Sequence, residues 1–210
     1  MGRQPLPAGI AVTAFLRRLL ERQRNYIAHP DPAAAMANFI AILIVWNGPF
    51  YPIYVIALVG WAGLPSFLTM LSTPFFFSVP WLMRRDTRLG RAAMATIGIA
   101  NTAWSIKLFG AASAVNLFLL PCMMMGALLY RRSERRLMLA ILGLAITAFF
   151  APAELYGAVI LPLTAEAEAR LANLNLVSVT MLTAVIAMQF AVTLRGVDKA
   201  TAPLERVHLG

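Results

Sequence analysis

Two ionisable side chains, Lys107 and Glu154, lie inside long apolar stretches of the sequence. A charge at the centre of a bilayer costs about 2.5–3.5 kcal/mol on insertion scales, so each such residue needs a partner or a function. If the apolar stretches cross a membrane in alternating directions, both residues fall near the outer ends of their spans, at similar depth. The two residues are therefore candidates for ligand binding within the membrane.

Neutral polar side chains recur in the outer half of the same stretches. Amide and hydroxyl groups at this depth can bind the head of a lipophilic molecule, particularly where prolines interrupt helical hydrogen bonds and separate the helices. The candidate pocket comprises Asn47, Tyr51, Tyr54, Lys107, Asn116, Glu154 and Asn175, beside the helix-breaking residues Pro49, Pro52 and Pro74. A pathway for protons or ions is disfavoured, because no carboxylate lies near the midplane.

A second interpretation of these residues involves no ligand. Lys107 would then extend to the outer lipid headgroups, and Glu154 would reach water beside Pro152. The asparagine side chains would join neighbouring helices by hydrogen bonds. Both interpretations remain open at the level of the sequence.

Other kinds of active site find little support. Both histidines, His29 and His208, lie outside the apolar stretches, so a membrane haem with two axial histidines lacks its ligands. The soft ligands that begin at Cys122 and continue through three methionines cannot converge on one copper ion, because consecutive helical residues point about 100° apart. Ser and Thr occur without a neighbouring base, and no Gly-rich phosphate loop is present. We expect no metal, no cofactor and no enzymatic activity.

The apolar stretches themselves are long enough to cross a bilayer. A transmembrane helix needs about 20 mainly apolar residues, because hydrocarbon offers no partner to a free backbone amide or carbonyl. Six windows meet this requirement: Met36–Ala57, Leu64–Met83, Leu89–Gly110, Ala111–Tyr130, Arg136–Gly157 and Leu174–Leu194. The 60% hydrophobic content and the mean hydropathy of +0.73 are typical of membrane proteins. We therefore predict an all-α, polytopic bundle of six transmembrane helices over residues 36–194.

Basic residues alternate between the two sides of this predicted bundle. Of the 18 Lys and Arg residues, only Lys107 and Arg170 fall on the outer side. Because Lys and Arg near span ends are retained in the cytoplasm, both termini are predicted to be cytoplasmic, and residues 195–210 form a short tail. Basic clusters between apolar stretches also argue against nucleic-acid binding. With an Arg- and Ala-rich composition, the predicted location is a bacterial inner membrane.

Residues 1–35 contain an amphipathic segment. Apolar residues recur at helical spacing at Ile10, Val12, Phe15, Leu16, Leu19 and Leu20. Arg17 and Arg18 lie among them, and Arg22 and Arg24 follow; all four are predicted to contact anionic headgroups while the apolar face enters the membrane surface. The segment from His29 to Pro32 should end this helix before the first span. Packing on a partner protein or on the cytoplasmic loops is the alternative.

Four short motifs stand out along the predicted bundle. They are Asn47-Gly48-Pro49-Phe50-Tyr51-Pro52, Leu108-Phe109-Gly110, Asn116-Leu117-Phe118-Leu119-Leu120-Pro121 and Arg131-Arg132-Ser133-Glu134-Arg135-Arg136. With the helix count and loop lengths, they resemble the six-helix membrane anchors of bacterial class III adenylate cyclases and quorum-sensing histidine kinases. The resemblance implies a receptor for a small lipophilic or membrane-derived ligand that signals through its last helix. Residues 195–210 are too few for a cyclase or kinase, so the output is expected on another polypeptide.

The sequence therefore predicts a non-catalytic six-helix sensor or ligand-binding module that acts through a partner protein. That partner is another membrane protein or a second copy of the chain; the chain is also expected to contact the lipid bilayer and to bind a lipophilic small molecule. A structural or accessory subunit of a larger inner-membrane complex is the first alternative. A small transporter or a quinone-binding accessory protein is the second.

Overall fold

The computed structural model describes the backbone of residues 8–207 and the side chains of residues 13–193. Every regular element in this part of the chain is a helix, which confirms the predicted all-α fold class. The side chains of Arg3, Arg195, Lys199 and Arg206, which were assigned to the cytoplasmic side, lie outside the described residues.

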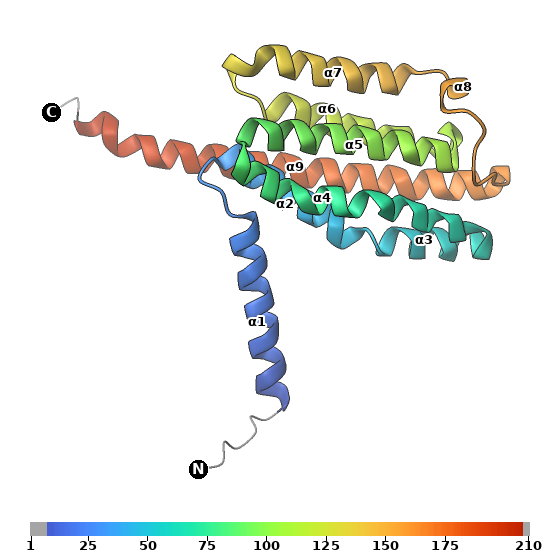
Figure 1. Cartoon of the computed structure of the whole chain (residues 1–210), viewed down its shortest axis with the longest axis horizontal. Coiled ribbons are helices and arrows are strands. Elements are labelled where there is room, and N and C mark those ends of the chain that lie inside the picture. Colours follow the sequence, from blue (N-terminus) through green and yellow to red (C-terminus); the bar gives the residue numbers. More distant parts are fainter. Residues whose placement is uncertain (1–7, 208–210) are drawn as a thin grey trace.

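Six rods of helix lie side by side and form a bundle (Figure 1). The first rod consists of α2 (Pro32–Asn47) and α3 (Phe50–Val59), the second of the 3₁₀ helix η1 (Gly60–Ser72) and α4 (Thr73–Arg85), and the third of α5 (Thr87–Phe109). The fourth rod consists of the 3₁₀ helices η2 (Ala111–Ser113) and η3 (Val115–Phe118) and of α6 (Leu119–Leu128). The fifth rod is α7 (Arg135–Phe150), between η4 (Arg132–Glu134) and α8 (Ala153–Tyr156), and the sixth is α9 (Ala165–Val207). These rods coincide with the six apolar windows of the sequence, and most ends agree closely.

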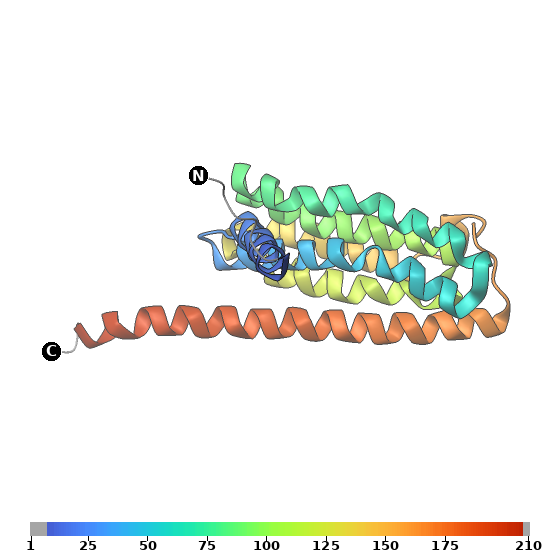
Figure 2. The same cartoon turned by 90° about the horizontal axis from the view of Figure 1, so that it is seen from below.

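The largest difference from the predicted boundaries occurs at α9. This helix begins at Ala165, not at Leu174, because the Ala- and Glu-rich segment before Leu174 is continuous with the apolar helix. Ala, Glu and Leu are strong helix formers, and the Thr164 hydroxyl accepts a hydrogen bond from the backbone N–H of Ala167 at 3.3 Å. At its other end α9 continues well past the bundle (Figure 2).

Prolines and glycines mark the interruptions within and between the first two rods. Pro49 cannot donate a backbone hydrogen bond, and it stands where α2 gives way to α3. Gly60 has a φ of 74°, which favours glycine, and there the chain reverses from α3 into η1. Pro74 does not break a helix as expected; it lies in the first turn of α4, where proline is well tolerated.

Two helical stretches of the described chain are long and apolar enough to cross a membrane. Phe50–Arg85 has 36 residues and contains an 18-residue window with a mean hydropathy of 1.7, and Ala165–Thr193 has 29 residues and contains such a window with a mean hydropathy of 1.9. The first stretch contains the reversal at Gly60, so it contributes to two rods. Together the stretches suggest association with a membrane, while the number of six crossings stays a prediction.

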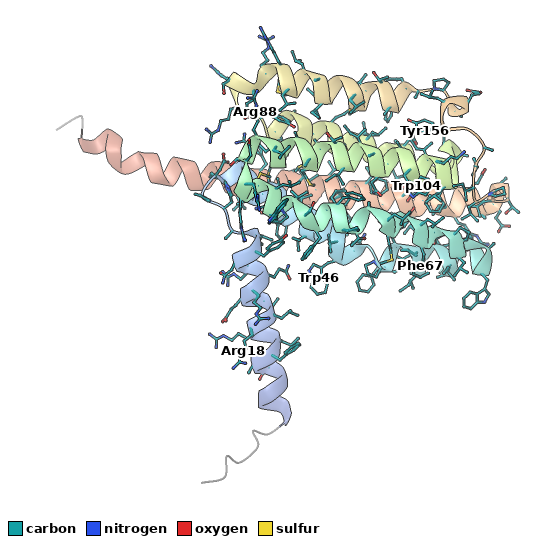
Figure 3. All side chains as sticks on the ribbon, viewed as in Figure 1. Arg18, Trp46, Phe67, Arg88, Trp104 and Tyr156 are labelled. Carbon is teal, nitrogen blue, oxygen red and sulfur yellow. The ribbon has the colours of Figure 1, made fainter. Side chains whose placement is uncertain are left out.

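Large apolar side chains cover the outside of the bundle. Trp61 is 82% exposed and Met181 is 66% exposed, and Phe75, Phe77 and Val192 are similarly open. The labelled side chains of Trp46 and Phe67 project outward from the rods (Figure 3). Water-soluble monomers rarely expose apolar surface on this scale, so the outer surface of the bundle is suited to contact with lipid or another apolar surface.

The helix α1 (Ala8–Ile27) leaves one end of the bundle and runs across the direction of the rods (Figures 1 and 2). Its C-terminal turn is fixed to α4: the Tyr26 hydroxyl donates to the backbone carbonyl of Phe77 at 2.7 Å, and the two rings stack. The Arg84 guanidinium donates to the carbonyls of Asn25 and Tyr26. These contacts set the direction of α1 relative to the bundle.

The interior of the bundle holds two groups of buried apolar side chains. One lies toward the end that carries α1 and includes Ile40, Phe76 and Met83. The other lies toward the opposite end and includes Phe109 and Leu171. Between these two groups, five of the rods line a cavity.

Candidate functional site

The cavity has a volume of about 590 Å³, is lined by the first, second, third, fourth and sixth rods, and opens to the surface. This volume lies within the range of small-molecule binding sites, about 300–1,000 Å³. The wall is mainly apolar, with side chains such as Leu43, Phe76 and Leu182, and polar groups are distributed among them. The fifth rod, α7, contributes no residue to the wall. The site is thus formed by convergent helices without any long loop.

Three of the predicted pocket residues, Asn47, Tyr51 and Tyr54, line this cavity. Asn47 and Tyr54 are exposed, so they stand at its mouth. Tyr51 extends further in, and its hydroxyl donates to Oδ1 of Asn175 at 2.9 Å. Asn175 is fully buried behind the wall and donates through Nδ2 to the backbone carbonyl of Ser113 at 2.8 Å. This chain of hydrogen bonds connects α3, α9 and η2.

The other three predicted residues, Lys107, Asn116 and Glu154, lie outside the cavity wall. Glu154 is exposed on α8, and no ion pair with Lys107 occurs within residues 13–193. Nζ of Lys107 instead lies close to Gly157, 3.0 Å from the position that a β-carbon would occupy there. Lys107 and Glu154 therefore lie at the end of the bundle near α8 and α7, and α7 is the rod that contributes no residue to the cavity wall.

The geometry of η3 explains why Asn116 does not face the cavity. A 3₁₀ helix has three residues per turn, so residues three apart lie on one face. Val115 and Phe118 are three apart and both line the cavity. Asn116, next to Val115, is directed to a different face.

A stripe of small and polar residues on α5 contributes more to the wall than the sequence led us to expect. Gly98, Thr102 and Ser105 are spaced four and three residues apart, so they lie on one face of α5. Asn101 lies beside them, and all four residues line the cavity. Ser178 of α9 lines the cavity as well. The spacing on α5 is the signal by which the sequence could have identified these residues.

A buried ion network closes the end of the bundle that carries α1. Arg91, only 3% exposed, donates to the carboxylates of Asp31 at 3.0 Å and Glu134 at 2.9 Å. The same guanidinium donates to the backbone carbonyl of Leu129 at 3.0 Å. Arg131 also pairs with Asp31, at 2.8 Å. The network therefore joins the start of α2, the start of α5 and the connection between α6 and α7.

Asp31 has two roles in this network. It caps α2, because Oδ1 accepts from the backbone amides of Ala33 and Ala34 at 2.9 and 3.2 Å. Burial by itself raises the pKa of this carboxyl group, but the amides of α2, Arg131 and Arg91 hold the pKa below its usual value. Asp31 is therefore ionised at neutral pH and pairs with two guanidinium groups.

The exposed basic side chains of α1 belong to the same end of the molecule. Arg17, Arg18, Arg22 and Arg24 are all exposed, and Arg17 pairs with Glu21 of the next turn at 3.2 Å. Figure 3 shows Arg18 on α1 and Arg88 at the adjoining end of the bundle, with Tyr156 at the far end. The apolar residues of α1, including Phe15 and Leu20, are equally exposed. The helix thus presents both kinds of side chain that an interfacial helix uses.

Comparison with known proteins assigns no family to the chain. No protein-family model, curated protein or solved structure matches it. Within residues 13–193, no group of three or more His, Cys, Asp and Glu side chains is arranged to hold a metal ion. The cavity, α9 and the charged end of the bundle are therefore the features from which a function can be inferred.

Proposed function

We propose that the protein is a non-catalytic membrane sensor whose cavity binds a small lipophilic ligand and whose last helix transmits the bound state to a partner protein. One observation carries this proposal: α9 lines the cavity and then continues beyond the bundle as part of a single helix of 43 residues (Figure 2). An unbroken helix can transmit a small displacement from the cavity to a distant surface. The short helical motifs that resemble the anchors of bacterial cyclases and quorum-sensing kinases favour the same role.

The proposal places the six rods across a bacterial inner membrane, with the Arg-rich end in the cytoplasm. Three observations support rods that cross a membrane. Trp61 and Trp81 lie near opposite ends of the second rod, as aromatic residues do at the two interfaces of a membrane. The guanidinium carbon of Arg85 lies 4.7 Å from the centroid of the Trp81 ring, a cation–π contact that is suited to the headgroup region. Finally, α1 runs across the rods, the direction of a helix that lies on the membrane surface (Figure 1).

Labelling of single cysteines tests the six crossings. In a Cys122→Ala background, we expect Trp61→Cys and Glu166→Cys to react with a membrane-impermeant maleimide on intact spheroplasts. Arg88→Cys and Arg132→Cys should react only after lysis, because they lie at the opposite end of the bundle. All four positions are exposed, so differences in reactivity report the side of the membrane. Reaction of all four in intact spheroplasts would contradict the proposed topology.

Filling the cavity tests ligand binding. Ser178 lines the cavity, whereas Thr180 is exposed on the same helix outside it. We expect small amphiphiles that copurify with the wild-type protein in polymer-extracted native nanodiscs to be lost from Ser178→Phe and retained by Thr180→Phe. Mass spectrometry of extracts from the three proteins gives the comparison. Equal retention by both variants would show that the cavity is not the binding site.

The accessory-subunit alternative makes a different prediction in the same purification. It is favoured by the exposed apolar residues of α1, of which Phe15 is 65% exposed and Leu20 is 59% exposed. Such a subunit would carry other membrane proteins in fixed stoichiometry, and Ser178→Phe would not change its composition. A sensor in the resting state would carry at most a second copy of the chain and the ligand.

A further inference from the structure

The exposure of the wall residues shows where the cavity opens. Most of them are buried or half-buried, and the exposed members belong to two adjacent rods: Asn47 and Tyr54 to the first, and Val177 and Met181 to the sixth. Val177 and Met181 lie one turn apart on α9 and are 59% and 66% exposed, so they form an edge of the wall that reaches the outside of the bundle. The cavity therefore opens on the side of the bundle, between the first and sixth rods.

Apolar packing closes the cavity toward both ends of the bundle. Phe76 lines the cavity and also belongs to the buried apolar group toward α1, whereas Val115 lines it and belongs to the group at the opposite end. Every wall residue lies within one of the rods, and none comes from a connection between them. Water meets a bundle that crosses a membrane at its two ends, so the side opening is the way in that remains.

The cavity lies between the two levels that the tryptophans of the second rod mark. Thr69 and Phe76 line the cavity, and along this rod they fall between Trp61 and Trp81. Tryptophan residues are enriched at the two interfaces of a membrane, so the side opening faces the hydrocarbon between them in the proposed topology. A molecule dissolved in the bilayer therefore reaches the opening without passing through water.

The chemistry of the wall fits an uncharged ligand. None of the described residues that line the cavity is charged, so the wall offers no counter-ion to an acid or an amine. Its amide and hydroxyl groups, such as those of Asn47 and Thr73, offer both hydrogens and lone pairs to a neutral head. Apolar side chains such as Leu43 and Leu182 lie among them. A charged head would lose its hydration here without compensation.

We propose that the cavity takes up uncharged molecules that are dissolved in the bilayer, and that these molecules enter sideways between the first and sixth rods. The inference rests on the proposed ligand-binding function and specifies both the class of ligand and its route. Val177 and Met181 form the edge of the opening on the sixth rod. This rod is α9, so the ligand passes directly along the helix that continues beyond the bundle.

Photolabelling with two matched probes tests the class of ligand. The protein in phosphatidylcholine nanodiscs is irradiated with octanol that carries a diazirine beside its hydroxyl group, or with the sulfate ester of the same alcohol at an equal mole fraction in the bilayer. Mass spectrometry of the peptides then locates the label. We expect the alcohol to label the wall around Thr102 and Cys122 about 100-fold more than the sulfate does, the ratio expected for an unpaired charge in hydrocarbon.

A matched pair of double variants tests the route. Val177→Trp with Met181→Trp places two large rings across the opening, whereas Met188→Trp with Val192→Trp places them on exposed positions of the same helix outside the wall. Each double variant replaces one valine and one methionine that lie four residues apart. We expect the alcohol to label the wall of the first variant only as weakly as the sulfate labels the wild-type protein, and to label the second variant like the wild type.

The possible failures of these experiments differ in meaning. Equal labelling of the wall by the alcohol and the sulfate would overturn the preference for uncharged molecules. Labelling that is undiminished in the first double variant, or lost equally in both, would overturn the sideways route. Either result would leave the ligand-binding function intact, because the wall would still be labelled in the wild-type protein. Absence of label from the wall with both probes would refute the proposed function itself, and this inference with it.

Discussion

Replacing Arg91 with methionine is expected to destabilise the protein by about 3–5 kcal/mol, because the carboxylates of Asp31 and Glu134 would remain buried without their common partner. Methionine keeps the apolar stem but supplies no charge, so the loss reports the ion network and not a cavity. In thermal unfolding followed by circular dichroism, the melting temperature should fall by on the order of 10 °C.

Arg88→Met is the matched control for this substitution. Arg88 lies on the same helix but is exposed, and none of the described ion pairs includes it. A surface charge of this kind contributes roughly 0–1 kcal/mol, so its removal should change the melting temperature little. If Arg91→Met does not accumulate, the triple variant that adds Asp31→Asn and Glu134→Gln should restore folding, since no unpaired charge remains. Equal melting temperatures for the two single variants would show that the network does not stabilise the bundle.

Acid titration provides a further check on Asp31. The pKa of this carboxyl group is lowered in the folded protein from its ordinary value of 3.8. Its contribution to stability is therefore fully present at neutral pH and is lost only as the pH falls through the lowered pKa. In Arg91→Met one of the groups that lower the pKa is absent, so the acid transition should begin at a higher pH than in the wild-type protein.

Asn175→Leu is expected to produce the second large effect, a loosening of the half of α9 that begins at Ala165. The substitution leaves the Tyr51 hydroxyl and the carbonyl of Ser113 without their partner, at a cost of about 1–3 kcal/mol for each buried group. Backbone amides of residues 165–185 should then exchange with deuterium faster, while those of α2 and α4 should change little. Hydrogen exchange followed by mass spectrometry measures both regions in one experiment.

The neighbouring Asn173 supplies the control for this prediction. It has the same side chain on the same helix but is exposed, so Asn173→Leu should leave the exchange of α9 unchanged. Tyr51→Phe removes only one of the two hydrogen bonds and should give an intermediate effect. Exchange that is equally fast in Asn173→Leu and Asn175→Leu would mean that the hydrogen bonds of Asn175 do not hold α9 to the cavity.

The helical architecture could be predicted from the sequence because length and apolar composition determine it locally. The windows expected around Leu89–Gly110 and Arg136–Gly157 correspond to α5 and to α7 with α8. The end of α1 before the segment from His29 to Pro32 was predicted because proline restricts its immediate neighbours. The start of α9 was placed at Leu174 because the charged residues before it lie outside the apolar window, although Ala and Glu favour helix wherever a helix already continues.

The candidate site was predicted only in part, because a cavity depends on which faces of distant helices meet. Asn47, Tyr51 and Tyr54 belong to one segment, so their common location followed from local spacing. Lys107 and Glu154 were grouped by depth alone, and depth does not specify the direction of a side chain around its helix. The direction in which a side chain points around its helix is determined by how the helices pack against one another, which the sequence does not show locally.

The same limitation explains why the ion network was not anticipated. Arg91 was one of many basic residues at the end predicted to be cytoplasmic, and the rule that assigns them to that side treats them alike. Its neighbour in the sequence, Arg88, is exposed, whereas Arg91 lies one turn later on the side that faces the bundle. The partners Asp31 and Glu134 come from segments far away along the chain. Their meeting could be known only from the fold.

The length of α9 has a mechanical consequence. A helix rises about 1.5 Å per residue, so its end at Val207 lies roughly 33 Å beyond Val185, the cavity residue nearest to it. If the bundle near the cavity serves as the pivot, the helix is a lever arm of that length. A tilt of about 5° at the pivot would displace the far end by about 3 Å, close to the donor–acceptor distance of a hydrogen bond. A movement too small to disturb the packing of the bundle would thus suffice to make or break a contact at the tip.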